Sequence, residues 1–167
     1  PARTDIIVAG GGAAGFMGAL RARELNPAAG VLILESGSRV LAKVAITGGG
    51  RCNVTNAHFE PAQWTRQYPR GQRELRGLYH RFGQPETLAW FRERGVRLKT
   101  EEDGRVFPTT DNARTVTGCL EETARRLGVR IETKCRVHAI ERCGDGGFTV
   151  HAKGRSWRCG RLLLATG

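Results

Sequence analysis

The chain has 167 residues, of which 40% are hydrophobic and 26% charged, a composition typical of one globular domain with a sizeable core. No run approaches the ~20 apolar residues that span a bilayer, and Asp5 with the glycines from Gly10 onward breaks the signal-peptide pattern, so a cytoplasmic protein without membrane contact is expected. The net charge of +11 is compatible with a polyanionic partner. However, the arginines are spread along the chain, which favours solvated basic faces over a nucleic-acid site. The one segment in which basic and aromatic residues alternate runs from Trp64 to Phe82.

A strand, a helix and a second strand are predicted at the N-terminal end. Asp5 to Ala9 is a short apolar run that stops at glycines, as in a buried parallel strand. Ala13 to Leu25 contains good helix formers and ends before Pro27, which cannot continue a helix. Val31 to Glu35 is a second buried-strand pattern. The sequence therefore predicts a right-handed βαβ unit over residues 1–35.

The middle of the chain, residues 36–128, is predicted to be a loop and helical insert. Residues 36–74 contain many glycines and turn formers and indicate a long ordered loop. Two helices are expected after it, one through residues 75–82 and one over 85–95, and then a hairpin over 96–107.

The remaining segments are predicted to return the chain to the sheet. A helix with its apolar stripe between Val116 and Leu127 would take Asp111 as its N-cap. Val129 to Ile131 would then form a strand. Residues 129–167 would add a small antiparallel meander, and finally a separate buried strand over 161–167. The expected segments of the meander are 136–142, 148–152 and 156–159.

The loop after the first strand has the spacing G-x-G-x-x-G. Gly10 permits the tight turn, Gly12 lets a diphosphate approach the backbone, and Gly15 lets the helix pack closely on the sheet. Ala13 and Ala14 open the helix, whose N-terminal amides favour an anion. The alternative is a glycine turn without a ligand.

Glu35 ends the second strand at the spacing expected of a ribose-binding acid, 20 residues after Gly15. Its charge would repel a 2′-phosphate and so disfavours NADP, although Arg39 nearby tempers this argument. FAD and NAD both contain the ADP group that such a loop binds. The long insert and the meander favour FAD over a simple NAD domain.

Three blocks of sequence resemble a known family. The first runs from Lys43 to Asn56 and includes Gly-Gly-Gly-Arg-Cys-Asn, and the others are 104–108 with 113–114, and 164–167. They are similar to the bacterial flavoproteins described as aminoacetone oxidase-like or dehydro-bile-acid reductase-like (BaiN-like). The resemblance implies an α/β, Rossmann-like FAD-binding domain with a parallel sheet, crossover helix and meander, as in glutathione reductase-type proteins.

The resemblance also implies roles for particular residues. The loop glycines and alanines would contact the diphosphate, Glu35 with Ser36 would lie at the adenosine ribose, and the backbone of Val137 would contact adenine. Thr166 and Gly167 would approach the diphosphate. The residues expected along the ribityl chain and flavin are Lys43, Gly48, Gly49, Gly50, Arg51, Cys52 and Asn53.

The residues of the first block have plainer interpretations too. Three glycines let backbone amides converge on an acceptor, and Arg51 would place a fixed charge near a phosphate or flavin. Lys43 is equally compatible with a solvated cation. A surface cation is the alternative for Arg51 and a turn former the alternative for Asn53, with a functional role favoured for both. Cys52 lacks a Cys-x-x-Cys partner, so a packing role is favoured over a redox disulfide, and no metal site is indicated.

Similar proteins continue beyond the final Ala-Thr-Gly, so the chain is expected to be the N-terminal portion of a longer flavoprotein and inactive alone. The favoured function is the FAD-binding portion, residues 1–167, of an oxidoreductase acting on an unidentified small organic substrate, with NAD(P)H a candidate electron donor. The alternatives are an NAD-binding domain without flavin and a nucleic-acid-associated flavoprotein of the tRNA-modifying type. No catalytic residue is assigned.

Overall fold

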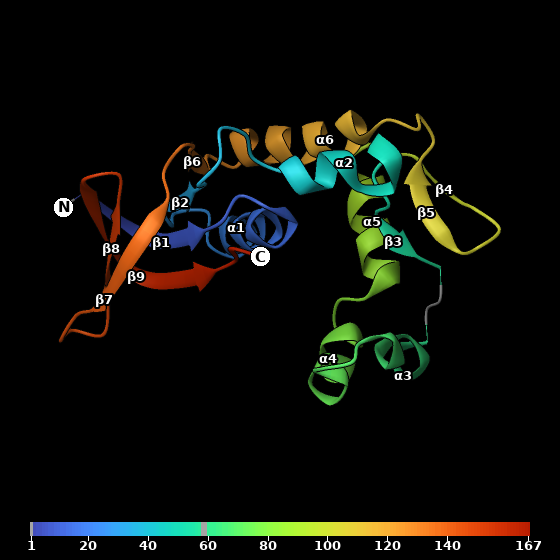
Figure 1. The fold of residues 1–167 in the computed structure, drawn as a ribbon, viewed down its shortest axis with the longest axis horizontal. Coiled ribbons are helices and arrows are strands. Elements are labelled where there is room, and N and C mark those ends of the chain that lie inside the picture. Colours follow the sequence, from blue (N-terminus) through green and yellow to red (C-terminus); the bar gives the residue numbers. More distant parts are fainter. Residues whose placement is uncertain (1, 58–59) are drawn as a thin grey trace. The chain divides into compact units, whose positions relative to one another are not determined.

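The computed structural model describes residues 2–57 and 60–167, which fall into two compact units. The first, called here the sheet unit, comprises residues 1–44 and 120–167, and the second, the insert unit, comprises residues 45–119 (Figure 1). The assignment of all 167 residues to one FAD-binding domain stays a prediction.

The sheet unit contains the predicted βαβ arrangement. Strand β1 (Ala2–Ala9) pairs in parallel with β2 (Val31–Leu34), which pairs in parallel with β6 (Arg130–Glu132). All four residues of β2 are buried, as expected of a strand covered on both faces. The prediction of a return to the sheet near residue 130 is confirmed.

Helix α1 (Ala13–Leu25) crosses over between β1 and β2 and packs on β1, β2 and β9 (Arg155–Leu164). Its buried side includes Phe16, Ala19 and Leu20, which recur at helical spacing. The helix ends at the residue before Asn26-Pro27, as predicted.

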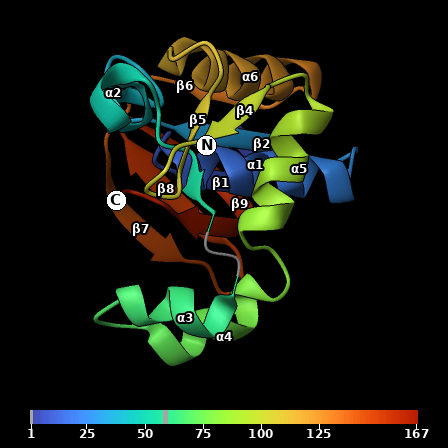
Figure 2. The ribbon, with the colours of Figure 1, turned by 90° about the vertical axis from the view of Figure 1, so that its right-hand side faces the viewer.

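The predicted meander and final strand form one sheet with the parallel strands, in the order β6-β2-β1-β9-β8-β7 (Figure 2). β7 (Val137–Arg142), β8 (Phe148–Ala152) and the first half of β9 are antiparallel, as expected. The prediction of two separate strands near residues 156–159 and 161–167 is wrong, because β9 runs unbroken past Gly160 and pairs with β1 from Trp157 to Leu164. The parallel hydrogen bonds to β1 hold the strand through the glycine.

The insert unit has a small antiparallel sheet, β3-β5-β4, and several short helices. β4 (Leu98–Thr100) and β5 (Arg105–Pro108) form the predicted hairpin, and β3 (Thr55–Asn56) pairs with β5. Helix α5 (Gln84–Glu93) contacts β3 and buries Trp90 and Phe91. This helix confirms the one predicted over residues 85–95.

The long loop predicted over residues 36–74 is shorter than expected. It contains α2 (Ala42–Gly50), α3 (Pro61–Trp64), the 3-10 helix η1 (Thr65–Gln67) and the start of α4 (Gln72–Tyr79). Pro61 stands at the first position of α3, where a missing N–H costs nothing. The loop prediction failed because helices of one or two turns leave little periodicity. Residues 58 and 59 lie outside the described part.

Helix α6 (Ala113–Arg126) follows the hairpin and confirms the fourth predicted helix. The prediction that Asp111 caps this helix is wrong. The N-cap is Asn112, whose Oδ1 accepts a hydrogen bond from the Arg114 amide at 2.9 Å. Asp111 instead adopts a left-handed backbone conformation (φ +50°) and pairs with Lys99 and Arg51. No helix in the described ranges is long and apolar enough to cross a membrane.

Candidate functional site: a dinucleotide-binding loop

The glycine loop closes over the carboxyl end of β1, where two glycines are required by close packing. Gly10 has φ +112°, and a Cβ added there would overlap the carbonyl group of Ala165. A Cβ on Gly15 would overlap the carbonyl oxygen of Gly10. These glycines therefore let α1 and the segment after β9 approach the loop, as the sequence predicted for Gly15.

Gly12 is different because its surroundings are open. A Cβ there would meet no described heavy atom within 4 Å, although the backbone (φ −86°, ψ −172°) would accept a side chain. Gly12 is the N-cap of α1, with no side-chain capping bond from a described residue and no acid in the first turn. Open space before uncapped amides at the positive end of a helix fits a diphosphate.

Glu35 is held beside this loop by backbone amides. Its Oε2 accepts a hydrogen bond from the Gly11 amide at 2.7 Å, and its Oε1 accepts one from the Gly37 amide at 2.6 Å. Ser36 donates its hydroxyl to Oε1 at 3.2 Å. The carboxylate is half-buried, and these contacts leave one lone-pair site free on Oε2 for a ribose hydroxyl. A second ribose hydroxyl would take the place of the longer Ser36 contact on Oε1.

The same contacts set the charge of Glu35. Burial alone would raise the pKa of this carboxyl group, but the amides of Gly37 and Gly11 and the Ser36 hydroxyl favour the ionised form more strongly, so the pKa is lowered. Glu35 is therefore an anion at neutral pH, which is the form that accepts hydrogen bonds from both ribose hydroxyls.

Other predicted site residues of the sheet unit gather at the same end of the sheet. The Leu41 amide donates to the Gly11 carbonyl at 2.8 Å, which brings the segment before Lys43 to the loop. A Cβ on Gly167 would lie 3.4 Å from the Lys43 Nζ. Thr166 and Gly167 follow β9 after Ala165, and a Cβ on Gly10 would lie 3.0 Å from the Thr166 amide nitrogen. Ligands of parallel α/β sheets bind at this carboxyl edge.

Val137 opens β7, two residues after Cys135, whose backbone is hydrogen-bonded to Glu35. The Cys135 amide donates to the Glu35 carbonyl at 2.8 Å, and Val137 packs in part against the core cluster that contains Trp157. This position is compatible with the adenine contact expected of its backbone. That contact stays a prediction.

The remaining predicted residues lie together in the insert unit, around a tight glycine turn. Gly48, Gly49 and Gly50 all have positive φ, between +57° and +86°, and the Cys52 amide closes the turn on the Thr47 carbonyl at 3.0 Å. A Cβ on Gly48 would lie 2.5 Å from the ring of Phe107. The turn therefore packs against β5, and its role toward flavin stays a prediction.

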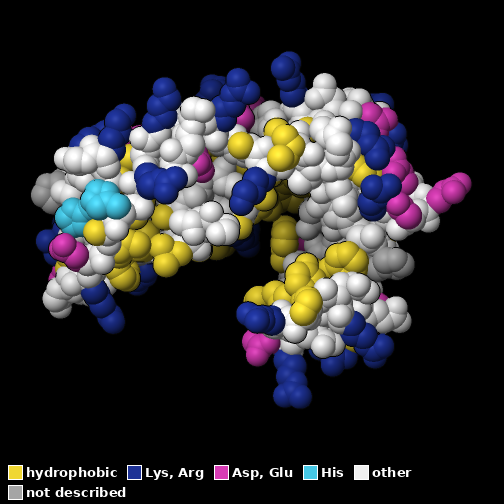
Figure 3. All heavy atoms as spheres, viewed as in Figure 1, with side chains coloured by type: hydrophobic (Ala, Val, Ile, Leu, Met, Phe, Trp, Pro, Cys, Tyr) yellow, Lys and Arg dark blue, Asp and Glu magenta, His cyan; other side chains and the backbone are white. Residues whose placement is uncertain are grey.

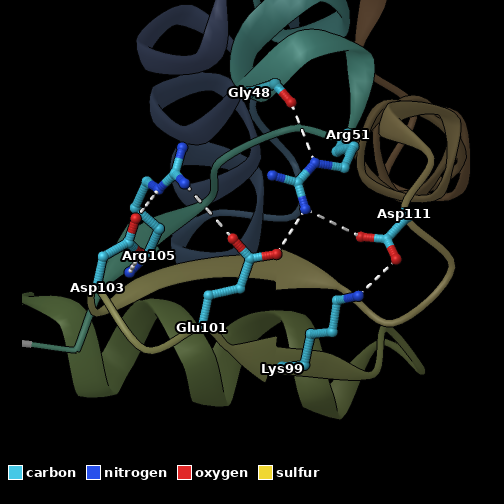
Figure 4. A network of polar contacts seen from close by, with 7 residues as sticks. All are labelled: Gly48, Arg51, Lys99, Glu101, Asp103, Arg105 and Asp111. Atoms are coloured by element: carbon cyan, nitrogen blue, oxygen red, sulfur yellow. Dashed lines mark hydrogen bonds and ion pairs between the residues drawn. The ribbon is translucent and has the colours of Figure 1, made fainter.

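Arg51 fastens this turn to the hairpin (Figure 4). Its guanidinium lies 3.9 Å above the Phe107 ring, and its Nε donates to the Gly48 carbonyl at 3.3 Å. Its Nη1 contacts Glu101 at 2.5 Å and Asp111 at 3.5 Å. Two carboxylates thus balance the charge that the sequence suggested for a phosphate or flavin, and they raise the pKa of Arg51 further.

Asn53 and Cys52 complete the turn. With its amide nitrogen toward the hairpin, Asn53 donates to the carbonyls of Thr55 at 2.9 Å and Val106 at 3.3 Å. Cys52 is buried at φ +66°, and burial raises the pKa of its thiol although Thr47 hydrogen-bonds to it. A buried, neutral thiol is compatible with a packing role.

Sequence reasoning missed the partners that fix these groups. The amides of Gly11 and Gly37, which hold Glu35, carry no side-chain signal. Asp111 was predicted only as a helix cap, and Glu101 was given no role of its own within the predicted hairpin. Their separation of 60 and 50 residues from Arg51 leaves no local pattern.

The fold and the loop define the class of protein. A parallel βαβ unit with an open glycine loop, an acid at the end of the second strand and an attached antiparallel meander are the features of the FAD-binding Rossmann domain of flavin-dependent oxidoreductases. Residues 4–167 match the HI0933-like protein Rossmann domain family, and the chain belongs to that family. The family expected from the sequence blocks is thereby confirmed.

Individual relatives agree with this assignment. The chain is 34% identical over 160 residues to the 3-dehydro-bile acid delta(4,6)-reductase of Clostridium scindens, covering 96% of the chain and 38% of the relative. It is 28% identical over 165 residues to the ribosomal RNA dihydrouridine synthase of Escherichia coli, which covers 99% of this chain and 40% of that relative. The chain thus spans about 40% of the length of these curated relatives.

A solved structure shows the same fold. The 3-ketosteroid-delta4-(5alpha)-dehydrogenase from Rhodococcus jostii RHA1 superposes with a TM-score of 0.74 at 20% identity, over 99% of this chain and 46% of that one. At this level of identity the likeness concerns the fold alone.

Proposed function

We propose that the chain serves as the nucleotide-binding part of an FAD-dependent oxidoreductase that saturates a carbon–carbon double bond in a small organic substrate. The observation that carries the proposal is the open Gly12 at the N-terminus of α1, with the ionised Glu35 beside it. The two relatives described above are named for reductions that add hydrogen across a double bond. NAD(P)H is the proposed electron donor, and a cytoplasmic location remains part of the proposal.

The residues of the sheet unit have distinct proposed roles. The amides from Gly12 to Gly15 hold the diphosphate, and Glu35 accepts the adenosine ribose hydroxyls. Lys43, beside Gly167, adds a positive charge at the same edge of the sheet. FAD, when bound, supplies hydride transfer, and the protein orients it and excludes competing reactions.

A single-turnover experiment with the full-length flavoprotein tests this proposal. The bound flavin is reduced anaerobically with NADPH or NADH, and a steroid that carries a conjugated 3-oxo-4-ene group is added. The proposal predicts reoxidation of the flavin and a steroid heavier by two hydrogens. Flavin that reoxidises only in oxygen, with neither this substrate nor RNA modified, would contradict it.

A second candidate is a flavin-dependent reduction of a base in RNA. The observation that favours it is the net charge of +11, together with the relative named as a ribosomal RNA dihydrouridine synthase. In the same experiment, RNA that gains two hydrogens in place of the steroid would select this candidate.

A further inference from the structure

A concentration of positive charge lies on the helices at one end of the insert unit. Between Trp64 and Phe82 the chain carries five arginines and a single acid, Glu74. All five side chains are exposed, and Figure 3 shows dark-blue side chains projecting from this part of the molecule. The residues, called here the basic helical surface, are Arg66, Arg70, Arg73, Arg76 and Arg81.

Several other arginines are paired with carboxylates, whereas these five have no acidic partner among the described residues. Arg105, Arg125, Arg155 and Arg158 are each paired with a carboxylate. In the described ranges, no carboxylate lies within ion-pair distance of the five arginines of the basic helical surface. Their charge is therefore available to a ligand.

The helices that carry the arginines are held together by aromatic residues. α3, η1 and α4 contact one another, and Figure 2 shows α3 and α4 side by side. The hydroxyl groups of Tyr68 and Tyr79 are 2.7 Å apart, which links the end of η1 to the end of α4. Arg73 and Arg76, three residues apart on α4, consequently share one face of a supported helix.

The same segment also exposes two large apolar side chains. Leu78 is 51% exposed and Phe82 is 48% exposed, just after Arg76 and Arg81 in the chain. Arginine forms paired hydrogen bonds to phosphate, and an exposed aromatic ring offers a surface on which a base can stack. Together these are the chemical elements of a site for single-stranded nucleic acid.

We propose that the basic helical surface binds single-stranded RNA, with its arginines on the phosphates and Phe82 against a base. The choice of RNA as the ligand rests on the second candidate function above. The exposed positive charge of the surface is an observation that does not depend on that function. An anionic membrane would match the charge as well, but among the described residues this surface exposes only Leu78 and Phe82 as large apolar side chains. An interfacial helix buries a longer apolar face.

Fluorescence anisotropy with a labelled single-stranded RNA of about 20 nucleotides, at several KCl concentrations, tests the proposal on the full-length protein. The test variant is R70Q/R73Q/R76Q, and F82A tests stacking. The matched control is R126Q/R130Q/R142Q, which removes three exposed arginines of the sheet unit that have no ion pair among the described residues. Thermal unfolding and flavin content establish that every variant is folded.

The proposal predicts that log Kd of the parent protein depends steeply on log salt. The triple variant should flatten this slope by about 2, since each phosphate contact on a single strand contributes about 0.7. F82A should weaken binding by about tenfold. The control variant should keep the affinity of the parent protein, and its salt slope should change by no more than the loss of one phosphate contact would cause.

Equal losses in the triple variant and the control would overturn the proposal, as would tighter binding to anionic phosphatidylglycerol vesicles than to RNA. Competition by heparin as strong as that by unlabelled RNA would also overturn it, because it indicates a surface that binds any polyanion. These measurements need no turnover, so the flavin function can hold where RNA binding fails.

Discussion

Gly12 and Gly15 lie three residues apart in one loop, but their surroundings predict opposite effects of substitution. Gly12→Ala places its Cβ in open space at an allowed backbone conformation, so the free energy of unfolding should change by less than about 0.5 kcal/mol. FAD affinity should fall by about tenfold or more, because the methyl group occupies the space before the helix amides.

Gly15→Ala is the matched comparison. Its Cβ would overlap the Gly10 carbonyl, so it should lower the stability of the protein without FAD by about 1–3 kcal/mol. Chemical denaturation and FAD titration of both variants separate the two effects. A Gly12→Ala protein that binds FAD as tightly as the parent would mean that the diphosphate does not lie at this position.

Glu35 gives a prediction that depends on pH. A carboxyl group with a lowered pKa in the folded state stabilises the fold fully above its unfolded pKa, near 4.5, and this contribution is lost as the pH falls through the folded pKa. In Glu35→Gln this part of the acid sensitivity should disappear. The variant should also bind FAD about tenfold more weakly at neutral pH, since a charged acceptor is lost.

Thermal unfolding from pH 7 down to pH 3 and an FAD titration at pH 7 test both statements. If Glu35→Gln loses stability with acid as the parent does, the hydrogen bonds from Gly11 and Gly37 do not set the ionisation of this residue. Ser36→Ala is a useful control, because it removes only the longest of the three hydrogen bonds described for the Glu35 carboxylate.

At the scale of elements, the glycine turn of α2 packs on β5 through Gly48. Gly48→Ala incurs both a left-handed backbone conformation, which costs about 1–2 kcal/mol, and a Cβ against the Phe107 ring. Gly49→Ala incurs only the backbone cost, because no described atom lies within 4 Å of its Cβ. Gly48→Ala should therefore be the less stable variant in urea, and equal stabilities would contradict this packing.

The elements also show what the sequence could and could not predict. β1, α1 and β2 were predicted with their observed pairing, because buried strands and a Pro27 stop are local signals. β9 was divided in two because arginines and Gly160 interrupt its apolar pattern, and its continuity depends on pairing with β1, which is 150 or more residues away. The sequence around β9 therefore does not indicate that the strand pairs with β1.

The candidate site follows the same rule. Gly10, Gly15 and Glu35 lie where their spacing predicted, because a glycine loop and an acid at a strand end are defined by the βαβ unit itself. The environment of Arg51 was not predictable, since Phe107, Glu101 and Asp111 reach it from a hairpin and a helix start far along the chain. Arg51 hydrogen-bonds to the glycine turn itself, whereas the sequence suggested a fixed charge near a phosphate or flavin.

At the scale of the whole molecule, charge and chain length bear on function in different ways. Ion pairs such as those of Arg51 and Arg158 neutralise part of the 27 lysine and arginine side chains, and the excess behind the net charge of +11 includes the arginines of the basic helical surface. The chain spans about 40% of the length of its curated relatives, so substrate chemistry has to be measured on the full-length protein. The glycine loop proposed to bind FAD, in contrast, lies within the described residues.

Cofactor identity is the most direct test of the account as a whole. The visible absorption spectrum of the purified full-length protein should show flavin bands, and mass spectrometry of the released cofactor should identify FAD. In the Gly12→Ala protein the bands should be weaker at equal protein concentration. A parent protein that is colourless, takes up no added FAD and shows no rise in Tm with FAD would contradict the assignment.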